Sequence, residues 1–287
     1  TALEFYKYWS VLPTIEGFTA DDYQTHFHDG RKVEVSGNGW EILDSTNTPS
    51  YNCKFVALMG NIAYPVVLDN IKGLADAYKA RFGVDFNQYN ITNFIRQNNL
   101  VFKFEIGEVK MAPSREALQY NDLTNNSIIN RILTMLNEIQ DSVQKQVNDC
   151  SNLWEAKKLY NQLFENFGSL HHLKDSTKLT YNGAELNNSS FNDLEKYMVG
   201  TCHVLSTHHR RGRTINFHTY NCTKYNWNRI TASNKSIVLE IDQEKHVYVR
   251  KAVNYLSAEH DCVTVYVLDF KGDNGLRSQV FQETGLD

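Results

Sequence analysis

The chain has 287 residues, of which 41% are hydrophobic and 12% aromatic, and this composition excludes a disordered protein. The formal net charge of −4 gives no argument for nucleic acid or an anionic membrane as a partner. No apolar run approaches the roughly 18 residues that a membrane-spanning helix needs, and five cysteines without short spacings argue against a disulfide framework.

The first block, residues 1–121, predicts a large α/β module in which strands alternate with helices. Gly60 and Asn61 separate two strand-like runs, and this pair predicts a β-hairpin. The expected strands are 32–35, 53–59, 62–68, 100–106 and 109–111, and the expected helices are 71–82 and 91–98.

The second block, residues 122–200, has the pattern of a helical linker or coil. Apolar residues recur at spacings of three and four from Ile129 to Leu163, which predicts one long helix or a helical hairpin. Asp122 or Thr124 is expected to cap its start. The polar residues 174–190 are expected to form a loop or a short hairpin, and residues 191–198 a further helix.

The third block, residues 201–287, predicts a smaller α/β module. Its expected strands are 202–206, 214–220, 237–241 and 263–268, with an amphipathic helix at 244–257 and another helix in the last dozen residues. The order strand, helix, strand between 237 and 268 predicts two parallel strands joined by a right-handed connection.

Two clusters in the third block could carry chemistry. The arginine-rich loop with Arg210, Arg211 and Arg213 is a candidate contact for phosphate or an acidic partner, and a solvated hairpin tip is the alternative. Zinc favours cysteine and histidine ligands, but the spacing of the second cluster matches no standard zinc site, so we expect no metal there. The members of this second cluster are Cys202, His203, His208, His209, His218 and Cys222.

The segment from Pro113 to Gln119 contains the candidate catalytic residues. Pro113 restricts the residue before it to an extended conformation, and Ser114 is a favoured helix cap, so Glu116 and Gln119 are expected in the first turns of a helix. Arg115 would project from this junction, where its charged guanidinium can stabilise a phosphoryl group that another domain delivers. On these residues alone, an exposed arginine beside a helix cap is the favoured interpretation.

A resemblance to known families changes the interpretation of this segment. Ser-Arg-Glu-Ala-Leu-Gln at 114–119 resembles the S-R-E-x-L-Q motif in the middle domain of the ninety-kilodalton heat-shock chaperones, which are ATPases of the GHKL type. The chain is also similar to the rIIA lysis-inhibition proteins of T-even-like phages, through Gly-Asn-Ile-Ala-Tyr-Pro at 60–65 and Ala-Pro-Ser-Arg-Glu-Ala-Leu at 112–118. The resemblance is specific over about residues 50–145 and faint elsewhere.

The resemblance implies a fold and a mechanism. The fold is that of the chaperone middle domain: a large α/β module, a helical coil and a smaller α/β module. In the mechanism, Arg115 approaches the γ-phosphate of ATP and Gln119 lies on the same catalytic loop, which Pro113, Ser114 and Glu116 support.

The resemblance also places ATP and its magnesium ion in a separate N-terminal domain. That domain carries a catalytic Glu, a magnesium-holding Asn and a D-x-G-x-G motif, and no such motif occurs in this sequence. This segment alone is therefore expected to bind no cofactor and to have no ATPase activity. The chain begins at Thr1 without an initiator methionine, which we interpret as a start inside a longer protein.

The implied biology is a role in lysis inhibition or in countering host exclusion systems. It places the protein in the cytoplasm of an infected bacterium, peripheral to the inner membrane, either as a homo-oligomer or with a phage or host protein partner. Two alternatives stay open: a non-catalytic protein-interaction module of the same fold, and a nucleic-acid-associated protein that uses the loop 208–213. Salt-dependent binding to DNA would mark the last one.

Overall fold

The computed structural model describes residues 6–9, 11–28, 31–44, 54–165, 169–191, 202–208, 216–221, 230–240, 251–252, 255, 264–268, 270 and 272–286. The chain forms two compact units, Thr1–Ser142 with His172–Thr177, and Val143–His171 with Lys178–Asp287. Each unit combines helices with a sheet of mixed direction, which confirms the α/β class that the sequence predicts.

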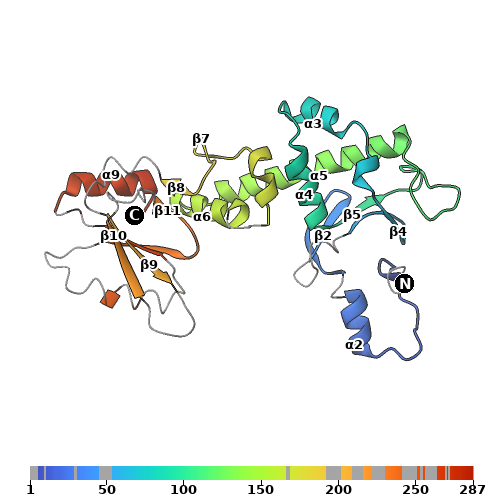
Figure 1. The fold of residues 1–287 in the computed structure, drawn as a ribbon, viewed down its shortest axis with the longest axis horizontal. Helices are drawn as coiled ribbons and strands as arrows, with labels where there is room; N and C mark the ends of the chain where they lie inside the picture. Colours follow the sequence, from blue (N-terminus) through green and yellow to red (C-terminus); the bar gives the residue numbers. More distant parts are fainter. Residues whose placement is uncertain are drawn as a thin grey trace. The chain divides into compact units, whose positions relative to one another are not determined.

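Unit 1 is built on a sheet with the strand order β1-β2-β5-β3-β4. Its strands are β1 (Val33–Gly37), β2 (Trp40–Leu43), β3 (Phe55–Met59), β4 (Ile62–Pro65) and β5 (Asn99–Phe104). Its helices are α2 (Ala20–Tyr23), α3 (Leu74–Phe82), α4 (Gln88–Gln97) and the first part of α5 (Asp122–Asn148), with shorter helical turns at Gln24–His28 and Leu68–Asn70. Figure 1 shows α3, α4 and α5 on one side of this sheet.

The predicted hairpin at Gly60 and Asn61 is confirmed. Met59 pairs with Ile62, and Gly60 has a φ of +59°, the positive value that such a two-residue turn requires. Two details differ from the prediction. The second strand ends at Pro65, and one further bond, from Val66 N to Phe55 O at 2.8 Å, follows it. The hairpin of β1 and β2 places a strand at Trp40–Leu43 that the sequence pattern did not reveal.

The two faces of the sheet bury different sets of side chains. Val101 on β5 joins Val56, Leu58 and Leu43 in a cluster closed by Tyr8. Side chains alternate along a strand, so the neighbouring Phe102 points to the other face. That face is turned toward α5, because Trp40, the cross-strand partner of Phe102, bonds to Glu138 on that helix.

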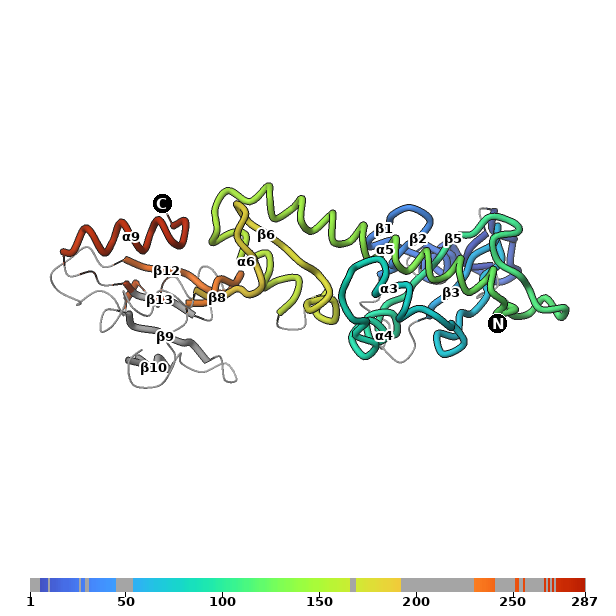
Figure 2. Tube along the Cα trace, turned by 90° about the horizontal axis from the view of Figure 1, so that it is seen from above, coloured from blue at the N-terminus to red at the C-terminus, as the bar shows by residue number. Residues whose placement is uncertain are grey.

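The second block begins with two helices rather than one. Helix α5 ends at Asn148, and α6 (Leu153–Phe164) starts after a cap in which Asn152 Oδ1 accepts a bond from Glu155 N at 2.9 Å. The start of α5 corrects the expected cap. Asn121 caps it, with Oδ1 accepting from Thr124 N at 3.0 Å, whereas Thr124 lies inside the first turn. Figure 2 shows α5 running along the sheet of unit 1.

Unit 2 contains the end of α5, α6 and the remaining strands. Its main sheet has the order β10-β9-β13-β12, and the pairing of β12 with β13 is parallel, as predicted. The strands are β6 (Thr180–Tyr181), β7 (Ala184–Glu185), β8 (Ser190–Phe191), β9 (Cys202–His208), β10 (Asn216–Asn221), β11 (Ile230–Thr231), β12 (Ser236–Glu240) and β13 (Thr264–Leu268). A turn of 3-10 helix, His171–Ser176, spans the boundary between the units.

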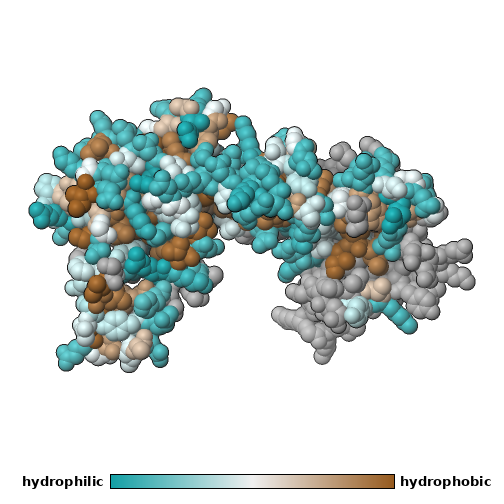
Figure 3. Space-filling model, turned by 180° about the vertical axis from the view of Figure 1, so that it is seen from behind, coloured by the Kyte–Doolittle hydropathy of each residue, from teal (hydrophilic) through white to brown (hydrophobic). Residues whose placement is uncertain are grey.

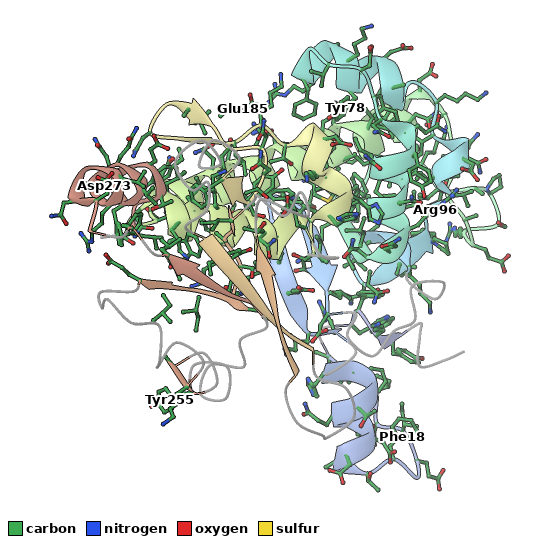
Figure 4. All side chains as sticks on the ribbon, turned by 60° about the vertical axis from the view of Figure 1, so that its left-hand side comes forward. Phe18, Tyr78, Arg96, Glu185, Tyr255 and Asp273 are labelled. Carbon is green, nitrogen blue, oxygen red and sulfur yellow. The ribbon has the colours of Figure 1, made fainter. Side chains whose placement is uncertain are left out.

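The predicted C-terminal helix is α9 (Asn274–Thr284), which Asp273 caps by accepting a bond from Leu276 N at 3.0 Å (Figure 4). Trp154 of α6 stacks on Phe191 of β8 with ring centroids 5.7 Å apart, and this pair belongs to the core of unit 2. The helices predicted over 191–198 and 244–257 lie largely outside the described residues. Phe191 itself is in a strand.

Candidate functional site

Residues 111–118 form a narrow loop rather than the start of a helix. Met111 and Leu118 form an antiparallel bridge, and Ala112 N donates to Ala117 O at 2.8 Å. Arg115 N donates to Ala112 O at 2.9 Å, which closes a tight turn at the tip. The expected helix with Ser114 as its cap is therefore wrong, because these bonds and the conformation of Arg115 are incompatible with an α-helix at this point.

Arg115 has an unusual backbone conformation. Its φ of +58° lies in the left-handed region, and among the described residues other than glycine only Asn182 shares a positive φ. Asparagine tolerates this region, whereas an arginine there bears a steric cost of about 1–2 kcal/mol. Such strain persists only where surrounding bonds hold the chain, and it often marks a functional loop.

The side chains at the tip of the loop face solvent. Pro113, Ser114, Arg115 and Glu116 are all exposed, and so is Gln119 beyond the bridge. Within the described part of the chain, the guanidinium of Arg115 forms no hydrogen bond or ion pair, although Glu116 is adjacent in sequence. Leu118, in contrast, is only 5% exposed and anchors the loop in the core of unit 1.

Both ends of the loop are tied to the β4 region. Tyr64 Oη donates to Met111 Sδ at 2.8 Å, and Val67 N donates to Tyr120 Oη at 2.6 Å. Burial raises the pKa of Tyr120 above its usual value, so this phenol stays protonated at neutral pH. The motif at 60–65 and the motif at 112–118 are therefore structurally linked, because Tyr64 of the first bonds to Met111 just before the second.

Two side chains of α5, Arg131 and Glu138, contact two turns. One is the β1–β2 turn, and the other is the turn at Glu108, before the loop. Arg131 donates from Nη1 to Asn38 O at 2.7 Å, lies 3.8 Å from Glu108 Oε2 and stacks over Phe104. Glu138 Oε2 accepts bonds from Asn38 N at 2.9 Å and from Trp40 Nε1 at 2.6 Å. These contacts lock the β1–β2 turn and the turn before the loop to one helix.

The β1–β2 turn can approach α5 this closely because it contains glycines. Gly39 has a φ of +76°, and a Cβ built there would lie 1.8 Å from Arg131 Nη1. A side chain at this position would therefore displace the guanidinium from Asn38 and Glu108. Sequence reasoning identified the glycine-rich turn but did not reveal Arg131, Glu138 or Tyr120, because their roles depend on contacts across about 50–100 residues of chain.

The other candidate sites are less informative. Arg210, Arg211 and Arg213 lie outside the described residues, so their loop stays a prediction. Among the residues that the structure does describe, no group of His, Cys, Asp or Glu side chains is placed to hold a metal ion. The described helices include none that is long and apolar enough to cross a bilayer. On the face drawn in Figure 3, hydrophobic groups form small separate patches among hydrophilic ones.

Comparison of the chain with models of protein families, with curated proteins and with solved structures gave no match. Any function assigned to the chain therefore depends on the loop 111–118 and the adjacent Gln119.

Proposed function

We propose that this chain is the ATP-sensing middle segment of a GHKL-type ATPase similar to the phage rIIA proteins. Arg115 is the residue that would contact the γ-phosphate of ATP bound in a separate N-terminal domain, with Gln119 beside it. The magnesium ion would be bound in that same domain together with ATP. The implied biological role is lysis inhibition or the countering of host exclusion systems.

The observation that carries this proposal is an exposed arginine without a partner on a strained but fastened loop. Nothing among the described residues engages its guanidinium, so all five N–H donors are available to an anion from outside the unit. The bridge at Met111 and Leu118 joins the two ends of the loop. An arginine placed in this way adds stabilisation as negative charge develops on a phosphoryl group, which is differential binding of the transition state.

We expect Arg115→Ala to lower ATP turnover by the full-length protein about tenfold, since a charge-assisted hydrogen bond of about 1.4 kcal/mol in the transition state corresponds to that factor. The KM for ATP should change little, because the nucleotide is held by another domain. Steady-state hydrolysis measured against ATP concentration tests this. Arg81→Ala is the matched control, since Arg81 is an exposed arginine at the end of α3.

A second substitution separates the role of the side chain from that of the backbone. Arg115→Gly removes the same guanidinium but accepts a φ of +58° without strain. It should match Arg115→Ala in turnover and exceed it in stability by about 1 kcal/mol. Turnover equal to that of the unmodified protein in both variants would refute the proposed role of Arg115.

A further inference from the structure

The base of the loop is closed by a ring of hydrogen bonds that includes the first turn of α5. Gln119 N donates to Lys110 O at 2.7 Å, and Asn121 N donates to Gln119 O at 2.9 Å. Thr124 N donates to Asn121 Oδ1 at 3.0 Å, and Lys110 N donates to Thr124 Oγ1 at 2.9 Å, which returns to the starting residue. The ring joins Lys110 before the loop, Gln119 after it, the cap residue Asn121 and the side chain of Thr124.

Thr124 contributes the bond that links the helix to the incoming end of the loop. It is 0% exposed whereas Lys110 is exposed, so the bond between them is partly buried. One turn later Ser127 Oγ donates to Glu108 O at 2.6 Å, and Arg131 then lies beside Glu108. Side chains of α5 thus satisfy two backbone groups before the loop, Glu108 O and Lys110 N.

This arrangement explains why residues 109–111 form no regular strand although their sequence suggests one. The N–H of Lys110 bonds to Thr124 and its C=O to Gln119, and neither pairs with a strand of the main sheet. The base of the loop is therefore attached to the first turn of α5. A change at Thr124 would alter the direction of the loop without touching Arg115.

We infer that Thr124 is a positioning residue that fixes the Arg115 loop to the first turn of α5. The inference rests on the proposed function, since the positioning matters for catalysis only if Arg115 acts on a nucleotide. The hydroxyl of Thr124 touches no reacting atom and acts through Lys110 and the loop base alone.

Thr124→Val tests the inference, because valine keeps the shape of threonine and removes the acceptor. We expect the amide of Lys110 to exchange with deuterium about tenfold faster, as for the loss of one partly buried hydrogen bond. In the full-length protein, kcat for ATP should fall about fivefold to tenfold with an unchanged KM. Thr124→Ser, which keeps the hydroxyl, should restore both values. Thr134→Val further along α5 is the matched control.

Asn121→Ala breaks the same ring from the helix cap and gives a second reading if Thr124→Val does not fold. Faster exchange around Lys110 and Gln119 is again expected. Unchanged exchange in a folded ring variant would overturn the inference. If Arg115→Ala lowers turnover but Thr124→Val leaves it normal, the inference about Thr124 is also overturned. The proposed function would stand in that case. If Arg115→Ala also left turnover unchanged, both would fall.

Discussion

Phe102→Ala is expected to lower the free energy of unfolding of unit 1 by about 3–5 kcal/mol, the range measured for buried aromatic truncations. Phe102 is 0% exposed in the central strand β5. Its ring meets that of Phe55 edge-on with centroids 4.8 Å apart and lies 6.5 Å from that of Phe104. The substitution therefore removes ring contacts on two sides and leaves a cavity that packed strands cannot close.

Hydrogen exchange measures this effect better than a single melting curve, because a chain with two units need not unfold in one step. Amides of β5 report on unit 1, and amides of α9 serve as an internal reference in unit 2. Tyr89→Ala is the control for an aromatic truncation, since Tyr89 is 75% exposed. It should change stability by less than about 0.5 kcal/mol. A loss below about 1.5 kcal/mol for Phe102→Ala would contradict the packing described for β5.

Gly39→Ala is expected to destabilise unit 1 by about 2–4 kcal/mol. The left-handed conformation of Gly39 accounts for about 1–2 kcal/mol of this. The remainder comes from Arg131, which the new methyl group would push away from Asn38 O and Glu108. Exchange of the amides in β1, β2 and β5 measures the loss.

Gly60→Ala is a closely matched control. Gly60 also occupies a hairpin turn with a positive φ, but nothing lies within 4 Å of a Cβ built there. It should show the conformational cost alone. In the background of Arg131→Ala, the two glycine substitutions should become equal within about 0.5 kcal/mol. Equal losses in the unmodified background would show that Arg131 does not fill the space above Gly39.

Much of unit 1 could be predicted from local pattern. The two-residue turn at Gly60 and Asn61, the mostly apolar run in β5 and the amphipathic stripe of α5 each depend on residues close in sequence. Strand β2 was missed although strands at β1 and β5 were predicted, because its pairing with the distant β5 is a tertiary contact. In unit 2 the parallel pairing of β12 and β13 followed from their order along the chain.

The loop was predicted in part. Its motif was found because Ser-Arg-Glu-Ala-Leu-Gln is distinctive, and Arg115 is exposed as expected. The predicted conformation was wrong. Pro113 and Ser114 favour a helix start locally, but the hydrogen bonds of the folded loop override that preference. The bridge at Met111 and Leu118 and the bond from Ala112 to Ala117 hold the chain in a hairpin instead.

The amino-acid sequence by itself determined most of the strands and helices of unit 1, because periodicity is a local property of the chain. Its motif at 114–119, through a resemblance, made Arg115 the candidate for phosphate contact. Only the tertiary structure decided that Arg115 lies in a strained turn without a partner among the described residues, and that Thr124, Asn121, Tyr120 and Arg131 hold the chain on either side of the loop. The physical reason is that each of those roles is a hydrogen bond or an ion pair formed by distinct segments. Each such bond forms only where helix α5 or strand β4 lies close to the loop. The distance between these segments cannot be read from residue spacing along the sequence.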